Sequence, residues 1–179
     1  RQRLVQEGLA GEVLHAPMQG FDLSGRFDLA HCLVSTFKYL LDERTARDAL
    51  GCVARALRPG GVFALGLHLT DYAQERRQRE RWVGRRGGTQ VVCNLQSWPP
   101  DRRRRRERLR SRLTVVRRGV VERTETSWDF RTYVEAQLAR LLGSVRELER
   151  VAVHDFSYDL DRPAREDHLD RVYVLRRRC

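Results

Sequence analysis

The chain has 179 residues, of which 41% are hydrophobic and 8% aromatic, a composition typical of a globular domain rather than of a disordered chain. No apolar run approaches the roughly 18 residues that a membrane helix needs, and the opening sequence RQRLVQEGLAG lacks the apolar segment of a signal peptide. We therefore expect a cytoplasmic protein with no membrane partner. The four cysteines form no C-x-x-C pair, so we expect neither a metal site nor a disulfide framework.

The net charge is +11, and 34 of the 35 basic residues are Arg, with Lys38 as the one Lys. The excess is local: residues 76–118 contain 16 Arg and three acidic residues, whereas the remainder contains 19 basic and 21 acidic residues. Such a cluster favours nucleic-acid binding, and the Arg run at 102–106, close to Trp98, is the candidate for phosphate and base contacts. A solvated loop in an Arg-rich chain is the simpler interpretation, so nucleic acid stays an alternative partner.

The first predicted elements are short. Residues 1–8 have the pattern of a helix end that stops at Gly8 or Gly11. Residues 12–18, EVLHAPM, predict a short strand, and residues 25–34, GRFDLAHCLV, predict a buried strand that follows a Gly turn.

The next element is the best-specified helix. Thr45 and Asp48 fit a Thr-x-x-Asp capping box, which predicts a helix that begins at this point. Apolar residues then recur at helical spacing on one face. They are Ala46, Ala49, Leu50, Val53 and Leu57.

The stretch ALRPGGVFALGL predicts a forced helix stop followed by a central strand. Pro59 cannot continue a helix, because it lacks an N–H and its ring clashes with the preceding turn. Gly60 and Gly61 permit a tight reversal. Residues 62–67 are apolar without alternation, the pattern of a parallel strand that is covered on both faces. Strand, helix and strand in this order predict a βαβ unit.

Residues 70–130 change character and predict antiparallel strands with one solvated face. Gly87 and Gly88 precede an alternating segment, and a hairpin turn is expected near Arg118-Gly119. The expected inward positions are Val91, Cys93, Leu95, Leu109, Ser111, Leu113 and Val115.

The last quarter returns to helix and strand. A helix is predicted over residues 130–145, with Gly143 as its stop and with a stripe of Tyr133, Leu138, Leu141 and Leu142. Residues 147–156 and 170–178 predict two strands joined by a polar loop at 157–167. Two late strands with a long connection suit an antiparallel edge on an otherwise parallel sheet.

Two motifs in the first half resemble a known family. Phe27-Asp28-Leu29, followed by a helix and Leu57-Arg58-Pro59-Gly60-Gly61, is similar to the second half of class I S-adenosylmethionine-dependent methyltransferases, in particular of the small-molecule type. The ending VAVHDFSYDL…DRVYVLRR is similar to the last two strands of that family. The resemblance implies an α/β, Rossmann-like, mostly parallel sheet with an antiparallel edge strand, partial, plus an inserted antiparallel β element.

The same resemblance implies a division of the chain. Residues 1–74 correspond to the C-terminal part of the methyltransferase core, residues 75–130 to a β-rich insertion or lid, and residues 131–179 to the last helix and two strands. The Gly-x-Gly-x-Gly cofactor loop of the family does not occur in this sequence, and in the family that loop precedes the strand that matches Val13. We therefore expect an N-terminally truncated chain that is inactive by itself.

The resemblance also implies a cofactor, S-adenosyl-L-methionine, and residues that contact it. Met18 matches an Asp-Met pair that lies beside the cofactor adenine in the family, with Pro17 in the place of the Asp. His31, Cys32 and Leu33 end the Phe-Asp-Leu strand and are expected to face the cofactor. Core packing of Cys32 and Leu33 is the alternative.

The acceptor side is expected at Phe37 and Tyr39, with His68 as the candidate catalytic base because it follows the apolar strand. A solvent-exposed His at a strand end is the alternative for His68. Trp82, Trp98 and Trp128 would supply an apolar wall in the lid, or else its own core. The sequence thus predicts methyl transfer to a small-molecule acceptor. The alternatives are a basic nucleic-acid-binding module and a non-catalytic pseudoenzyme.

Overall fold

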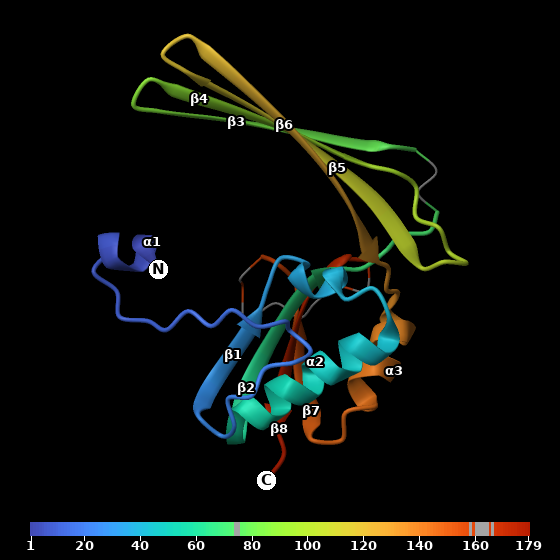
Figure 1. The fold of residues 1–179 in the computed structure, drawn as a ribbon. Helices are drawn as coiled ribbons and strands as arrows, with labels where there is room; N and C mark the ends of the chain where they lie inside the picture. Colours follow the sequence, from blue (N-terminus) through green and yellow to red (C-terminus); the bar gives the residue numbers. More distant parts are fainter. Residues whose placement is uncertain (74–75, 158, 160–164, 166) are drawn as a thin grey trace.

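The computed structural model describes residues 1–73, 76–157, 159, 165 and 167–179, and most of the loop predicted at 157–167 lies outside them. The chain forms two four-stranded sheets (Figure 1). A mixed sheet forms the core together with the helices α2 and α3. An antiparallel sheet extends from one end of that core and arches over it.

The N-terminal segment contains one short helix and no strand. Helix α1 spans Gln2–Gln6, and Gly8 follows it with φ +66°. The strand predicted at residues 12–18 is wrong: residues 11–17 have no regular structure, and a turn follows in which the Gly20 N–H donates to the Pro17 carbonyl at 3.0 Å. A strand requires a partner for its ladder, and no described strand pairs with this segment.

The predicted βαβ unit is confirmed. Strand β1 (Phe27–Cys32) pairs in parallel with β2 (Leu57–His68), and helix α2 (Glu43–Ala56) connects them through the short 3₁₀ helix η1 (Thr36–Tyr39). The N-cap of α2 is Asp42 rather than Thr45, because the Asp42 carboxylate accepts from the Thr45 N–H at 2.9 Å. The capping box predicted at Thr45 therefore lies one turn too late.

The Pro-Gly-Gly element lies inside β2 and not at the helix end. Helix α2 ends at Ala56, and β2 begins at Leu57, two residues before Pro59. Gly60 has φ +81°. A Cβ on Gly61 would lie 2.9 Å from the Arg58 carbonyl oxygen and 3.1 Å from that of Phe27, so this position requires glycine for the close approach of the backbones.

The mixed sheet has the order β1-β2-β8-β7, with β7 at Leu148–His154 and β8 at Asp170–Arg177. Strand β8 is antiparallel to both β2 and β7. The predicted antiparallel edge is therefore wrong in position. The last strand inserts between its two neighbours, and β7, which runs in the same direction as β2, forms the edge. In this central position, the backbone N–H and C=O groups of β8 can form hydrogen bonds with a strand on each side.

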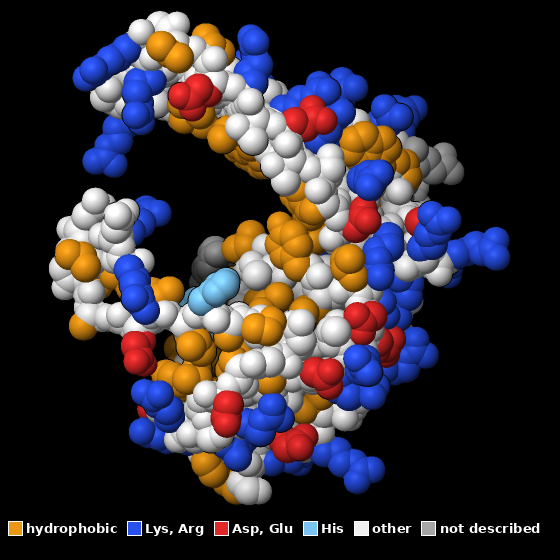
Figure 2. All heavy atoms as spheres, viewed as in Figure 1, with side chains coloured by type: hydrophobic (Ala, Val, Ile, Leu, Met, Phe, Trp, Pro, Cys, Tyr) orange, Lys and Arg blue, Asp and Glu red, His pale blue; other side chains and the backbone are white. Residues whose placement is uncertain are grey.

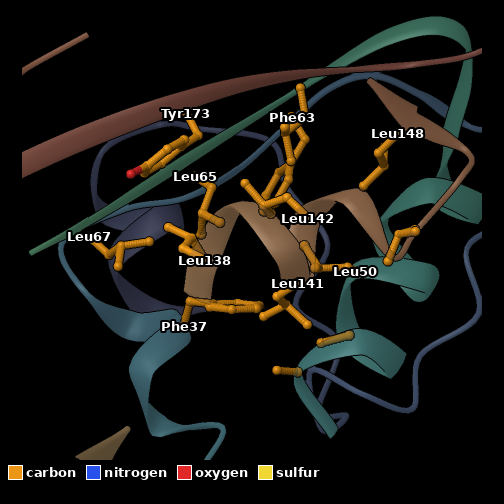
Figure 3. Close-up of a cluster of buried hydrophobic side chains, with 14 of the residues drawn as sticks. Phe37, Leu50, Phe63, Leu65, Leu67, Leu138, Leu141, Leu142, Leu148 and Tyr173 are labelled. Atoms are coloured by element: carbon orange, nitrogen blue, oxygen red, sulfur yellow. The ribbon is translucent and has the colours of Figure 1, made fainter. Parts of the chain in front are cut away.

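The core lies between the mixed sheet and the helices α2 and α3 (Glu135–Gly143), which cover the same face (Figure 1). Figure 3 shows side chains from both helices meeting those of the central strands. The predicted helical stripes are confirmed in part: Leu57 begins β2, and Tyr133 precedes α3, because the helix predicted over 130–145 spans only Glu135–Gly143. Fully buried residues from them and from the strands include Leu50, Phe63, Leu65, Tyr133, Leu138, Leu141 and Tyr173.

The antiparallel sheet has the order β3-β4-β5-β6, at Gln78–Arg86, Thr89–Ser97, Arg106–Arg117 and Val120–Arg131. The turn predicted at Arg118-Gly119 is confirmed, with φ +49° and +78°, as a two-residue hairpin requires. We call the side of this sheet that carries Trp82, Cys93, Leu113 and Trp128 its inner face, and the opposite side its outer face. Cross-strand pairing places these four residues on one face.

We predict that Leu65→Ala lowers the free energy of unfolding by about 2–5 kcal/mol, because Leu65 is fully buried at the centre of the core and its truncation leaves a cavity. Leu9→Ala, at a position that is 60% exposed, is the matched control and should change the stability by less than about 0.5 kcal/mol. Urea denaturation followed by circular dichroism measures both values. Equal losses would contradict the placement of the core.

Candidate functional site

A strained turn follows β1 at the carboxyl end of the parallel strands. Val34 and Ser35 both have left-handed backbone angles, with φ +55° and +64°, which a β-branched residue such as Val rarely adopts. The Ser35 N–H donates to the Gly66 carbonyl at 3.1 Å, and the Ser35 hydroxyl accepts from the His68 N–H at 3.1 Å. Strain of this kind persists where surrounding contacts enforce it, often at ligand sites.

Gly66 permits this turn to approach β2. A Cβ at this position would lie 3.0 Å from the Leu33 side chain. The glycine thus brings the ends of β1 and β2 together, and the predicted site residues Leu33 and His68 lie on the two segments that it joins.

Beside this turn lies a hollow of about 530 Å³, between the end of β1 and helix α2. Its lining contains four of the five predicted cofactor residues, Met18, His31, Cys32 and Leu33, together with Phe37. Pro17 does not line it and is exposed. The other lining residues were not predicted from the sequence as site residues, and apart from Thr36 their apolar character was the one available signal. They are Phe21, Ala30, Thr36, Ala49, Leu50, Val53 and Phe63.

The hollow is predominantly apolar. Burial raises the pKa of the Cys32 thiol, which keeps that thiol protonated and uncharged at neutral pH. No carboxylate lines the hollow among the described residues, and its polar side chains apart from the thiol are His31 and Thr36. Such a lining suits a flat, uncharged ring better than a charged group.

His68 lies at the end of β2 and pairs with a carboxylate from another strand. Its Nδ1 donates to Asp170 Oδ1 at 2.9 Å, and both side chains are about half exposed. Asp170 begins β8, which pairs with β2 in a register that places these two residues opposite each other. The carboxylate fixes the ring with its Nε2 available for proton transfer, as a general base requires. The sequence-based analysis missed Asp170, which is 102 residues away in the chain.

The two predicted acceptor residues occupy different environments. Phe37 is 2% exposed and belongs to the core. Tyr39 is 49% exposed, and its ring meets that of Phe130 edge to face at 4.8 Å between centroids. Phe130 lies on the inner face of the antiparallel sheet, so Tyr39 joins that face to the core.

The three predicted wall residues divide between the two faces. Trp82 and Trp128 lie on the inner face, whereas Trp98 lies on the outer face, where the guanidinium groups of Arg77 and Arg110 stand over its ring. Figure 2 shows hydrophobic side chains along the side of this sheet that faces the core, across an open cleft.

Lys38 anchors the antiparallel sheet to the site. Its side chain is 2% exposed, and Nζ donates to the His68 carbonyl at 3.3 Å and to Glu107 Oε2 at 3.5 Å, with the Phe130 ring 5.3 Å away. Burial lowers the pKa of Lys38, while Glu107 opposes that shift. Sequence reasoning did not predict this anchor. The one sequence feature that could have drawn attention to Lys38 is that it is the one Lys in the chain.

A second anchor uses Glu43 at the start of α2. Glu43 Oε2 accepts from Arg105 at 3.2 Å and from Arg131 at 3.1 Å, and both guanidinium groups stand over the Tyr133 ring. Arg105 belongs to the Arg run at 102–106, so part of that run joins the sheet to the core instead of facing solvent. The backbone of Arg105 is left-handed, with φ +54°, because this residue lies in the turn before β5.

Two further classes of site find no support in the described residues. No group of three or more His, Cys, Asp or Glu side chains in them is placed to hold a metal ion. No helix among them is long and apolar enough to cross a membrane.

Comparisons with known proteins show which solved structures share this fold. No protein-family model and no curated protein sequence matches the chain. Among solved structures, the chain is similar to an S-adenosylmethionine-dependent methyltransferase from Clostridium acetobutylicum, with a TM-score of 0.79 and 14% identity over 99% of this chain and 69% of the other. The sugar N-methyltransferase KedS8 from Streptoalloteichus has a TM-score of 0.75 and 19% identity, over 99% and 67%.

A third similar structure is CalS10, an amino pentose methyltransferase from Micromonospora echinaspora, with a TM-score of 0.66 and 18% identity over 90% of this chain and 63% of the other. The chain therefore has the fold of S-adenosylmethionine-dependent methyltransferases. It spans about two thirds of the length of these structures.

We predict that an amine-reactive reagent modifies Lys38 slowly in the native protein and at least about tenfold faster in Glu107→Ala, because loss of the ion pair favours local opening at the anchor. Glu80→Ala, which removes an exposed carboxylate from the same sheet, is the control and should leave the rate unchanged. Peptide mapping by mass spectrometry identifies Lys38 unambiguously. Rapid labelling of the native protein would contradict its burial.

Proposed function

We propose that this chain carries the acceptor-side half of an S-adenosylmethionine-dependent methyltransferase that acts on a small molecule. The observation that carries the proposal is the apolar hollow at the carboxyl end of β1, in a chain with the methyltransferase fold. In open α/β sheets, ligands bind outside the carboxyl ends of the strands. The strained turn at Val34-Ser35 lies at that end.

The residues present fit one part of the cofactor. The apolar lining, with Met18 and Phe21 at its margin, suits the adenine ring. With no carboxylate in the lining and no Gly-x-Gly-x-Gly loop in the sequence, the ribose hydroxyls and the methionine end find no matching group in this hollow. We therefore expect the 179 residues by themselves to bind the cofactor weakly and to transfer methyl groups slowly.

The bound cofactor would supply an electrophilic methyl group on a sulfonium. On the acceptor side, the role of this chain is to orient the nucleophile and to remove its proton. His68 is the base we assign: Nε2 takes the proton of the acceptor group, and the Nδ1–H donates to Asp170, which stabilises the charged ring. The acceptor thus gains the methyl group and loses its proton to His68.

The acceptor itself would lie in the cleft between His68 and the inner face of the antiparallel sheet. Trp82, Trp128 and Tyr39 offer aromatic surface there, which suits a small molecule with an apolar face. KedS8 and CalS10 are described as methyltransferases of a sugar and of an amino pentose. By analogy, a sugar-like small molecule is the acceptor class we propose to test first.

We predict that the cofactor or its product, S-adenosylhomocysteine, shifts the NMR signal of the Met18 methyl group. Met18 is the one Met in the chain, so a methyl-labelled sample gives a single signal that reports directly on the hollow. Cys32→Phe, which fills the hollow, should reduce the affinity at least about tenfold, since overpacking excludes the ring.

The matched control is Cys179→Phe, which adds the same side chain at an exposed position and should leave the titration unchanged. A Met18 signal that stays in place at millimolar ligand would overturn the assignment of the hollow. An identical thermal midpoint for the Cys32 variant is needed to show that it still folds.

A further prediction separates binding from chemistry. His68→Ala should leave the Met18 titration intact and lower the transfer rate by about 10²–10⁴-fold. Asp170→Asn should lower the rate less, because the base is retained and only its orientation and charge stabilisation are lost. Release of S-adenosylhomocysteine measures turnover. A His68→Ala variant with full activity would eliminate the catalytic role.

A further inference from the structure

The outer face of the antiparallel sheet carries a regular array of cations. Arg79 and Arg81 on β3 lie in cross-strand rows with Arg110 and Arg112 on β5, through Gln96 and Asn94 on the strand between them. Residues two apart on a strand are separated by about 7 Å, and strands two apart by about 10 Å. The backbone positions of the four Arg therefore lie at the corners of a rectangle, with Gln96 and Asn94 along its middle line.

The array keeps a strong excess of positive charge. Apart from Arg106 and Arg131, which pair at the end of the sheet that joins the core, the described residues of the outer face include eight Arg and two acidic residues, Glu125 and Asp129. Glu125 pairs with Arg112 at 2.5 Å and with Arg110 at 3.7 Å, and Asp129 pairs with Arg108 at 3.5 Å. The eight are Arg77, Arg79, Arg81, Arg85, Arg108, Arg110, Arg112 and Arg123.

The composition of the chain does not explain this excess. Outside residues 76–118 basic and acidic residues are nearly balanced, as a solvated surface usually is. On the outer face away from the core, these eight Arg outnumber the two acidic residues four to one. Figure 2 shows Lys and Arg side chains along the outside of this sheet and hydrophobic ones along the side that faces the core. The excess of positive charge is therefore concentrated on the outer face, and the sequence segment alone does not explain it.

The array surrounds a shallow hollow and ends in an aromatic ring. A depression of about 360 Å³ is lined by the four Arg of the rectangle, by Asn94 and Gln96, and by Glu80 and Leu95. At one end, the guanidinium groups of Arg77 and Arg110 stand 5.5 and 5.3 Å from the centroid of the Trp98 ring. Aromatic rings and guanidinium planes are both surfaces on which nucleic-acid bases stack.

We propose that the outer face binds a single-stranded nucleic acid, with phosphates on Arg79, Arg81, Arg110 and Arg112 and bases against the Trp98 stack. The two amide side chains lie on β4, between the Arg of β3 and those of β5. The Gln96 Oε1 accepts from Arg110 at 2.9 Å, and the Asn94 amide and the Gln96 amide N–H can meet base edges. A duplex is disfavoured because a flat sheet face presents no helix or ribbon tip to a groove. A lipid surface is disfavoured because the middle of the rectangle is polar and offers no apolar wedge.

This proposal does not depend on the methyltransferase assignment, because the outer face is turned away from the cleft and no methyl donor takes part. It also differs from an interpretation based on the Arg run at 102–106. Arg105 of that run is bound to Glu43, and Arg104 lies 3.8 Å from Asp101.

The test is fluorescence anisotropy with labelled single-stranded RNA and DNA of twelve nucleotides, between 50 and 300 mM salt. Four phosphate contacts predict a slope of about −3 in the plot of log K against log salt. Arg79→Glu/Arg81→Glu should weaken binding at least about tenfold and roughly halve the slope, whereas Arg79→Lys/Arg81→Lys should retain most of the affinity, because the charge remains.

The matched control is Arg140→Glu/Arg146→Glu, the same charge change at two exposed positions on and just after α3. If this control loses as much affinity as the outer-face variant, binding follows net charge and the proposal fails. Tighter binding to a hairpin duplex, or to phosphatidylserine vesicles, than to the single strand would also overturn it. Unchanged circular dichroism and unfolding midpoints verify that all variants are folded.

Discussion

The position of the antiparallel sheet depends on one carboxylate. Glu43, in the first turn of α2, accepts from Arg105 and Arg131, which enter from the loop before β5 and from the end of β6. Charge-assisted bonds from guanidinium groups that are mostly buried are strong and directional, and the helix N-terminus favours an anion at this place. Both guanidinium groups also stand over Tyr133, so the start of β5 and the end of β6, which pair with each other, are fixed to the core at one point.

This attachment gives the two faces of the sheet different surroundings. With Lys38 and Glu107 as a second anchor, the apolar inner face is held over the carboxyl ends of β1 and β2, where the hollow and the His68–Asp170 pair lie. The cationic outer face is directed away from them. This separation keeps the Arg side chains of the outer face in water, since a desolvated cation inside the cleft would be costly.

Much of the local structure could be predicted from periodicity and turn chemistry. Helical spacing identified α2 and α3, two-residue alternation identified the antiparallel strands, and Arg118-Gly119 identified a hairpin turn. These signals work because each depends on residues that are close in sequence. The predicted cofactor residues Met18, His31, Cys32 and Leu33 were chosen through motif position, and the structure places them around one hollow. Their contact with a cofactor stays a prediction.

Other features required the tertiary structure. Residues 12–18 have a strand-like pattern but no partner, and β8 inserts between β2 and β7 because it can pair on both sides there. The contacts of His68 with Asp170, of Lys38 with Glu107 and of Arg105 with Glu43 join residues that are 62 to 102 positions apart. The sequence by itself determined most of the helices, strands and turns, since local backbone preferences and hydrophobic period decide these. Only the tertiary structure decided which charged groups meet, since such pairs leave no periodic trace in the chain.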